Sequence, residues 1–243
     1  MDCRDGQRVF AKRRQAGWVR LACTDAHSTV TVAFQCLLEY KRVNLFCGAV
    51  MRTIVLASTS PYRRQLLQQL QLPFVAAVPR FEEVIEQGVA PGLLVKHLAA
   101  GKAESLAPYN PDALIIGADQ VFVDPRNRIL GKPGDADAAE DQLRAMAGKT
   151  HTFYTGVAVH DSLSGETIAD YSTYTVTLRH LDREQIRSYV ERENPVDCAG
   201  SFKIEGLGIA LMDEMAGEDY TSLIGLPLIK LIRILEQFGV KTL

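Results

Sequence analysis

Apolar residues along this chain form short β-branched runs that alternate with segments of helical spacing. The run 53–57 predicts a strand, and Ser60 followed by Pro61 predicts the N-cap and first turn of a helix. The continuous apolar run 113–117 is typical of a central strand that is buried on both faces. Two long alternating stretches, 151–160 and 167–178, predict an antiparallel hairpin. This alternation favours an α/β fold.

The remaining segments fit the same pattern. They predict a strand at 74–78, a helix that starts at Pro91, a short hairpin with strands at 121–123 and 129–130, a helix at 136–146, a helix from Asp182 through Tyr189, and a helix at 227–238. Asp182 and Gln185 have the spacing of a capping box. We expect the buried run 113–117 to end at residues 118–120, where the sequence becomes polar.

Residues 1–50 differ in composition from the rest of the chain. They contain eight basic and four acidic residues, the only tryptophan and four of the five cysteines, which show no zinc-type spacing. Met51 is followed directly by the first strand-like run. We therefore expect residues 1–50 to be a poorly ordered extension or outside the native protein, and residues 51–243 to be the working domain. An arginine-rich targeting leader is the alternative, although the segment lacks an apolar core followed by a small-residue cleavage site.

Charge and hydropathy narrow the classes of partner. The formal net charge is −2 in 243 residues, so no overall basic field favours nucleic acid or an anionic membrane. No run reaches the roughly 18 apolar residues that a membrane-spanning helix needs. We expect a cytoplasmic protein that binds neither nucleic acid nor membrane, and in which any anion is bound by a local cluster.

Three polar clusters interrupt this scaffold, and we expect all three at the ends of strands. Residues 58–64 combine the hydroxyls of Ser58 and Ser60 with two guanidiniums at a helix N-terminus, an arrangement suited to phosphate. Asp119 follows the buried run and Gly117, a residue that lets other groups approach the backbone closely. Lys132, in a Gly-Lys-Pro sequence, could reach an anion. Taken singly, the first two clusters also fit structural roles, as a capped helix with solvated arginines and as a turn cap.

The clusters together resemble the Maf family of nucleotide pyrophosphatases. The matching motifs, in order along the chain, are 56–64, 117–120, 131–133, 153–156 and 225–228. The resemblance extends from Met51 almost to Leu243, whereas residues 1–50 match nothing in that family. It implies a Maf/ITPase-like α/β fold with a mixed sheet, flanking helices and two lobes around a central phosphate-binding cleft.

The resemblance also implies roles for individual residues. Arg63, Lys102 and Lys132 match the phosphate-binding cations of the family, Glu83 matches an acid that helps to hold a divalent metal, and Asp119 matches the catalytic acid and a metal ligand. The cofactor would be magnesium, manganese or cobalt. In this scheme Asp119 orients or deprotonates a water that attacks the α-phosphorus, and pyrophosphate leaves on the cations.

Three positions indicate the base. Tyr62, Gln120 and Glu205 depart from the commonest family pattern and resemble the branch that acts on 7-methyl-GTP. Methylation at N7 makes guanine cationic, so Tyr62 can stack on it with a cation–π component, and Glu205 can accept hydrogen bonds from its N1–H and 2-amino groups. Local packing is the alternative role for all three residues.

Two other functions stay open at this stage. One is a broader pyrophosphatase that acts on pyrimidine triphosphates such as dTTP and UTP. The other is a non-catalytic nucleotide-binding module linked to cell division. The sequence also leaves a homodimer open.

Overall fold

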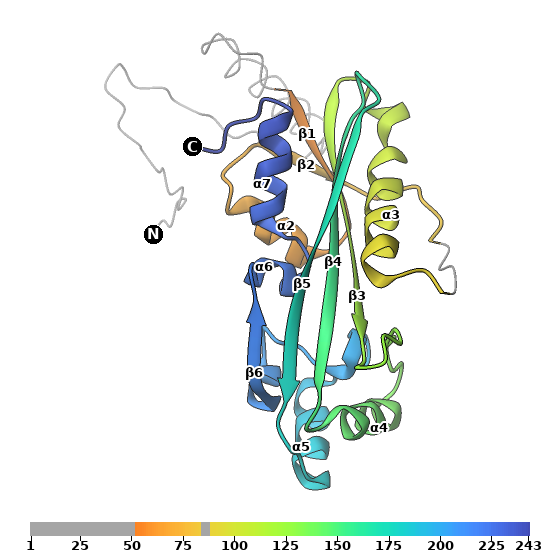
Figure 1. Ribbon diagram of the computed structural model, residues 1–243, viewed down its shortest axis with the longest axis vertical. Coiled ribbons are helices and arrows are strands. Elements are labelled where there is room, and N and C mark those ends of the chain that lie inside the picture. Colours follow the sequence, from red (N-terminus) through yellow and green to blue (C-terminus); the bar gives the residue numbers. More distant parts are fainter. Residues whose placement is uncertain (1–51, 84–87) are drawn as a thin grey trace, which may run out of the picture. The chain divides into compact units, whose positions relative to one another are not determined.

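The computed structural model describes residues 52–83 and 88–243, and the prediction for residues 1–50 lies outside these ranges. Figure 1 shows a sheet whose long strands carry helices on both faces. The strands are β1 (Thr53–Ala57), β2 (Phe74–Ala77), β3 (Ala113–Val123), β4 (Thr150–Asp161), β5 (Thr167–Leu178) and β6 (Met212–Gly217). The α-helices are α2 (Pro61–Gln68), α3 (Pro91–Glu104), α4 (Ala136–Met146), α5 (Arg183–Glu193), α6 (Tyr220–Ile224) and α7 (Leu228–Gln237). Three short 3₁₀ turns lie at Ala107–Tyr109, Ala199–Ser201 and Leu207–Leu211.

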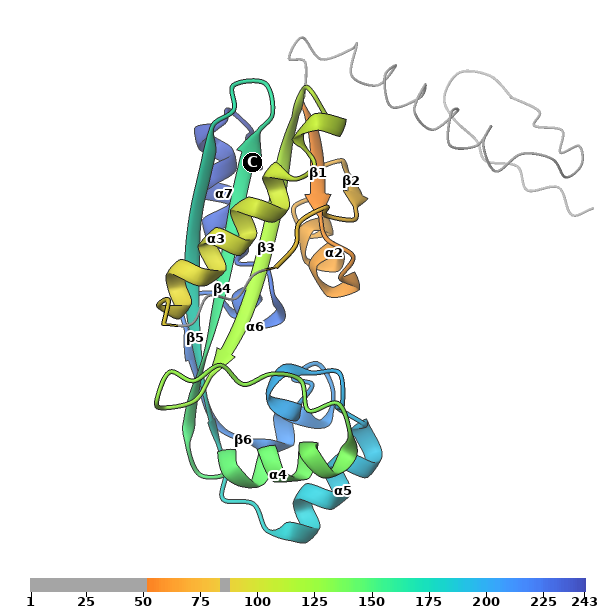
Figure 2. The same ribbon diagram turned by 90° about the vertical axis from the view of Figure 1, so that its right-hand side faces the viewer.

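The six strands form one mixed sheet in the order β2-β1-β3-β4-β5-β6. Strand β1 pairs in parallel with β2 and β3, whereas β4, β5 and β6 are added in antiparallel fashion. The predicted α/β class with a mixed sheet and flanking helices is therefore confirmed. Helices α2, α3 and α7 lie along one half of the long strands, and α4 and α5 lie near the other end (Figures 1 and 2). A cleft between two lobes stays a prediction.

The two faces of β3 have separate apolar cores. Even-numbered residues such as Ile116 and Ala118 pack with Leu66 of α2 and Leu231 of α7. Odd-numbered residues pack on the opposite face, where Val121 meets the α3 side chains. Because successive strand residues point to opposite faces, Asp119 lies on the α3 face and Gln120 on the face of α6 and α7.

Most predicted elements are confirmed, including the capping box of α5, but the polar end of β3 was predicted wrongly. Strand β3 does not end at residues 118–120; it continues through Asp119 and Gln120 to Val123. The short hairpin that we expected beyond it is reduced to one bridge between Val123 and Ile129. Polar residues in a buried strand are tolerated when partners distant in the sequence satisfy them, and both of these side chains have such partners.

Strand β6, helix α6 and the short 3₁₀ segments were not predicted from the sequence. Edge strand β6 has the sequence Met-Asp-Glu-Met-Ala-Gly, in which no alternation of apolar residues is evident, and α6 has only five residues. Helix α5 is also longer than predicted and ends at Glu193. Within the described residues, none of the helices combines the length and hydropathy needed to cross a membrane.

Helix α3 lies directly on the backbone of the sheet at two glycines. A Cβ atom at Gly117 would overlap the carbonyl oxygen of Ala99, and one at Gly156 would overlap that of Val95. Gly117 precedes Asp119 by two residues on the same face, and Gly156 is paired with Asp119 across the sheet. Both glycines therefore let α3 approach closely on either side of Asp119.

We predict that Gly117→Ala lowers the free energy of unfolding by about 1–3 kcal/mol, because the new methyl group would overlap the backbone of α3 at Ala99 and Ala103. Chemical denaturation followed by circular dichroism measures the change. The matched control is Gly131→Ala, where the added Cβ has no atom within 4 Å, so stability should stay within about 0.5 kcal/mol. Equal stability of the two variants would contradict the packing argument.

Candidate active site

Asp119 lies two residues beyond the last residue of β3 that pairs with β1. The parallel pairing of β1 with β3 ends at Ala57 and Gly117, and β3 continues beside β4 (Figure 2). The chain leaves β1 through Ser58 into the N-terminus of α2. Side chains from either face of the sheet can therefore meet Asp119 at the end of β1.

The carboxylate of Asp119 is buried and paired with an equally buried ammonium. Lys102 Nζ lies 2.5 Å from Asp119 Oδ1 and 2.7 Å from Glu83 Oε1, so one ammonium bridges two carboxylates. Both Lys102 and Asp119 are 7% exposed, whereas about half of the Glu83 side chain is exposed. Burying two charges costs several kcal/mol unless they compensate each other, and here they do.

Burial raises the pKa of Asp119, and the positive charges of Lys102 and Arg63 oppose that effect. The charge of Glu83 acts in the same direction as burial. These effects require Arg63, Lys102 and Glu83 all to lie near the Asp119 carboxylate. The structure thus brings together four of the residues that the sequence indicated. A carboxylate with a raised pKa is a better proton acceptor in chemistry near neutral pH.

The loop after β1 is held by its own serines. Ser58 Oγ accepts a hydrogen bond from Ser60 N–H at 3.1 Å, and Ser60 Oγ accepts one from Arg63 N–H at 3.4 Å. Ser60 is the N-cap of α2 and Pro61 follows it, as predicted. The start of α2, with its outward N–H groups, therefore lies at the open end of β1, where an anion can bind.

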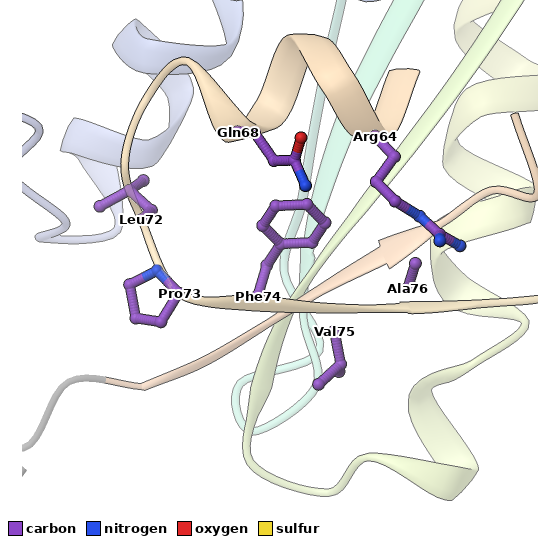
Figure 3. A pocket seen from close by; sticks show the side chains of 7 residues that line it. All are labelled: Arg64, Gln68, Leu72, Pro73, Phe74, Val75 and Ala76. Atoms are coloured by element: carbon purple, nitrogen blue, oxygen red, sulfur yellow. The ribbon is translucent and has the colours of Figure 1, made fainter. Parts of the chain in front are cut away.

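Arg63 and Arg64 differ in direction. Arg63 Nε donates to the carbonyl oxygen of Gly225 at 2.8 Å, and its charge acts on Asp119. Arg64 instead lines a pocket of about 580 Å³ between α2 and β2, where it lies near Phe74 and Ala76 (Figure 3). Of these two arginines, therefore, Arg63 is the one whose charge acts on Asp119.

Lys132 is placed apart from this group. It is exposed. Burial raises the pKa of Cys198, and the positive charges of Lys203 and Lys132 partly oppose this rise. Among the described residues Lys132 forms no ion pair with Asp119 or Glu83. Lys132 therefore lies near Cys198, and its phosphate contact stays a prediction.

Glu205 lies on an exposed loop that is tied to the end of α5. Lys203 N–H donates to the hydroxyl of Tyr189 at 2.9 Å, and Lys203 Nζ donates to the carbonyl oxygen of Glu193 at 2.7 Å. Leu207 N–H donates to Glu193 Oε1 at 2.8 Å. The backbone on both sides of Glu205 is thus fixed while its carboxylate faces solvent.

Gln120 and Tyr62 have different surroundings. Gln120 Nε2 lies within hydrogen-bond distance of the carbonyl oxygens of Ser222 (2.8 Å) and Leu223 (3.1 Å) and of Thr155 Oγ1 (2.9 Å). Tyr62 is 45% exposed on α2, one residue before Arg63. Gln120 therefore joins α6 to the sheet, which is the packing alternative for this residue, whereas Tyr62 presents a free ring surface.

The donor set around Asp119 fits a hard divalent cation. Magnesium-type ions are commonly held by one or two carboxylates together with substrate phosphates, and Glu83 and Asp119 already converge on one cationic group. Within residues 52–83 and 88–243, no three His, Cys, Asp or Glu side chains gather closely enough to hold a metal by themselves. The remaining ligands would therefore have to come from water and phosphate.

Sequence reasoning missed the carbonyl of Gly225 as the partner of Arg63. The signal was present, because Gly225 begins one of the five motifs, but hydrogen-bonding partners 162 residues apart cannot be paired from spacing. It also missed the partner of Thr155, a residue of the motif 153–156, whose hydroxyl donates to the carbonyl oxygen of Ser222 at 2.7 Å.

We predict that Gln120→Glu lowers stability by about 1–3 kcal/mol, because a carboxylate cannot donate to the carbonyl oxygens of Ser222 and Leu223. Thermal unfolding measures the change, with the exposed Gln68→Glu on α2 as the matched control. A Gln120→Glu protein as stable as this control would show that the contact with α6 contributes little.

The chain is similar to several known proteins. The family model described as Maf-like protein matches residues 53–238. The 7-methyl-GTP pyrophosphatase of Syntrophotalea carbinolica is 63% identical over 193 residues, which covers 79% of this chain and 98% of that protein. The protein of the same name from Pseudomonas aeruginosa is 50% identical over 191 residues, covering 79% and 99%. The solved structure of the Staphylococcus aureus Ham1 protein is 15% identical, with a TM-score of 0.41, and covers 64% of this chain and 89% of that one. By the family model and by these relatives, the chain belongs to the Maf family.

Proposed function

We propose that this protein hydrolyses 7-methyl-GTP to 7-methyl-GMP and pyrophosphate. The observation that carries the proposal is the pairing of buried Asp119 with Lys102, near Arg63 and Glu83, at the end of β1. Relatives that carry the name 7-methyl-GTP pyrophosphatase, at 47–63% identity over nearly their full length, support the choice of substrate.

Hydrolysis of a phosphoanhydride depends mainly on charge neutralisation and on the position of the attacking water. Arg63 and Lys102 bind phosphate oxygens, and the N-terminus of α2 adds N–H donors. Asp119 accepts a proton from the water that forms the new bond to the α-phosphorus. The bond from this phosphorus to the bridging oxygen breaks, and pyrophosphate leaves with that oxygen.

Glu83 and Asp119 are the residues that would hold a divalent cation, for which magnesium, manganese and cobalt are the candidates. When bound, such an ion supplies positive charge to the triphosphate. Lys102 then lies near phosphate oxygens as well as carboxylates. Its ammonium can therefore stabilise the negative charge that develops on the leaving pyrophosphate. We propose Lys132 as a third phosphate-binding cation.

Recognition of the base is assigned to Tyr62 and Glu205. The exposed ring of Tyr62 stacks on the cationic methylated guanine, and the carboxylate of Glu205 accepts from its N1–H and 2-amino groups. Gln120 does not contact the base in this proposal; it fixes α6 to the sheet through its hydrogen bond to the carbonyl oxygen of Ser222. We place the enzyme in the cytoplasm, with the nucleotide as its partner.

We predict that Asp119→Asn lowers kcat by at least about 10²-fold, because an amide cannot accept the proton from water. Pyrophosphate release from 7-methyl-GTP in magnesium, manganese or cobalt measures the change. The matched control is Asp161→Asn, a buried carboxylate at the far end of β4 that is paired with Arg52 and should leave turnover unchanged. Turnover by Asp119→Asn equal to that of the wild type would exclude the proposed base.

The titration of Asp119 gives a second test of the same residue. Burial raises the pKa of Asp119 above its ordinary value of 3.8, and only the ionised form accepts a proton. We predict that in the metal-free protein the Asp119 carboxyl titrates above pH 3.8, as measured by NMR of the side-chain carboxyl carbon, with Asp119→Asn to assign the signal. Titration at the ordinary pKa of aspartate would mean that the surroundings of Asp119 do not raise its pKa.

We predict that 7-methyl-GTP is hydrolysed much faster than GTP, dTTP or UTP, and that Glu205→Gln lowers the preference over GTP by about tenfold. The measurement is kcat/KM across this panel. The control is Glu191→Gln, which changes an exposed acid on α5. Equal rates on dTTP or UTP would favour the broader pyrophosphatase, and tight nucleotide binding without release of pyrophosphate would favour a binding module.

A further inference from the structure

A buried carboxylate outside the group around Asp119 joins two helix starts. Asp219 is 5% exposed and is the N-cap of α6. Its Oδ1 accepts from the N–H of Thr221 at 2.9 Å and from the hydroxyl of Thr221 at 2.5 Å. Its Oδ2 accepts from the N–H of Ile229, in the first turn of α7, at 2.9 Å.

No lysine or arginine within residues 52–83 and 88–243 forms an ion pair with Asp219. A buried charge is costly unless hydrogen bonds compensate it, so the donors of α6 and α7 have to stay in place around this carboxylate. The carboxylate therefore fixes the starts of α6 and α7 relative to each other.

Thr221 closes the same network from the other side. Its hydroxyl oxygen accepts from the N–H of Leu228 at 2.9 Å, and its carbonyl oxygen accepts from the N–H groups of Gly225 (3.1 Å) and Leu226 (3.2 Å). The carbonyl oxygen of Thr221 thus holds the start of the three-residue turn 225–227. The hydroxyl of Thr221 and the carboxylate of Asp219 hold the residues that follow the turn. Thr221 is 4% exposed, so water does not compete for these bonds.

The turn held in this way carries the partner of Arg63. Gly225 has φ +122°, a backbone conformation that glycine adopts without strain, and its carbonyl oxygen accepts from Arg63 Nε at 2.8 Å. A guanidinium bound through Nε keeps its two terminal nitrogens for other acceptors. The carbonyl of Gly225 therefore sets the direction in which Arg63 presents those nitrogens.

We infer that Asp219 and Thr221 are positioning residues for Arg63, acting through the carbonyl of Gly225. The inference rests on the proposed function insofar as Arg63 binds the triphosphate. Neither residue touches the substrate in this account. Their effect is on how well the guanidinium is aligned with phosphate oxygens, and an error of about 1 Å in such alignment can cost about 10²-fold.

A double-mutant cycle between Thr221→Val and Arg63→Ala tests this inference. Thr221→Val keeps the shape and the N–H of Thr221 but removes its hydroxyl. We expect it to lower kcat/KM for 7-methyl-GTP about tenfold, mainly through KM, and we expect Thr221→Ser to restore most of the loss. In the Arg63→Ala background the same change should cost less than about twofold, because the group that it positions is absent.

Asp161→Asn again serves as the control, because it alters a buried carboxylate that accepts backbone N–H groups far from Arg63. It should lower stability without changing KM. If Thr221→Val does not fold, Asp219→Asn takes its place in the cycle. An equal loss in both backgrounds, or no loss in the wild-type background, would overturn the inference.

Calorimetric binding of inorganic tripolyphosphate separates this inference from the proposed function. The ligand has no base and needs no hydrolysis, so the same non-additive pattern in its affinity would support the positioning role even if 7-methyl-GTP were not the substrate. Additive effects on tripolyphosphate affinity, in a protein that does hydrolyse 7-methyl-GTP, would refute the positioning role alone.

Discussion

The direct contact of α3 with the sheet is the constraint on which the site depends. Gly117 and Gly156 have no side chains to hold the helix away, so the carbonyl groups of α3 rest on β3 and β4 on either side of Asp119. At this separation Lys102 Nζ lies 2.5 Å from Asp119 Oδ1, and both residues are buried. The same closeness excludes water, which strengthens the interaction of the two charges and raises the cost of separating them.

Charged side chains reach Asp119 from both faces of the sheet. The α3 face brings Lys102 and Glu83 to Asp119, and the opposite face brings Arg63 on α2, oriented by the turn between α6 and α7. Because β1 ends at Ala57, the two sets of charges can act on one another past its end. A short strand beside a long one thus creates the place where an anionic chain can meet cations from both sides.

The local pattern predicted most elements and singled out Asp119 and the cluster that contains Arg63, whereas Lys102 and Glu83 were indicated only by the resemblance to the Maf family. Gly117 was expected to allow close approach, and the contact with Ala99 confirms it. Asp119 and Gln120 were taken as the end of a strand because local polarity cannot reveal compensating partners such as Lys102, 17 residues before Asp119, or Ser222, 102 residues after Gln120. For the same reason the carbonyl of Gly225 could not be paired with Arg63 from the sequence alone.

A crystal structure of the Asp119→Asn protein with 7-methyl-GTP and magnesium tests the central claim most directly. We expect the triphosphate to lie at the end of β1, with Arg63 and Lys102 both in contact with its oxygens and the α-phosphorus facing residue 119. A triphosphate bound elsewhere, with Lys102 still confined between Glu83 and residue 119, would contradict it.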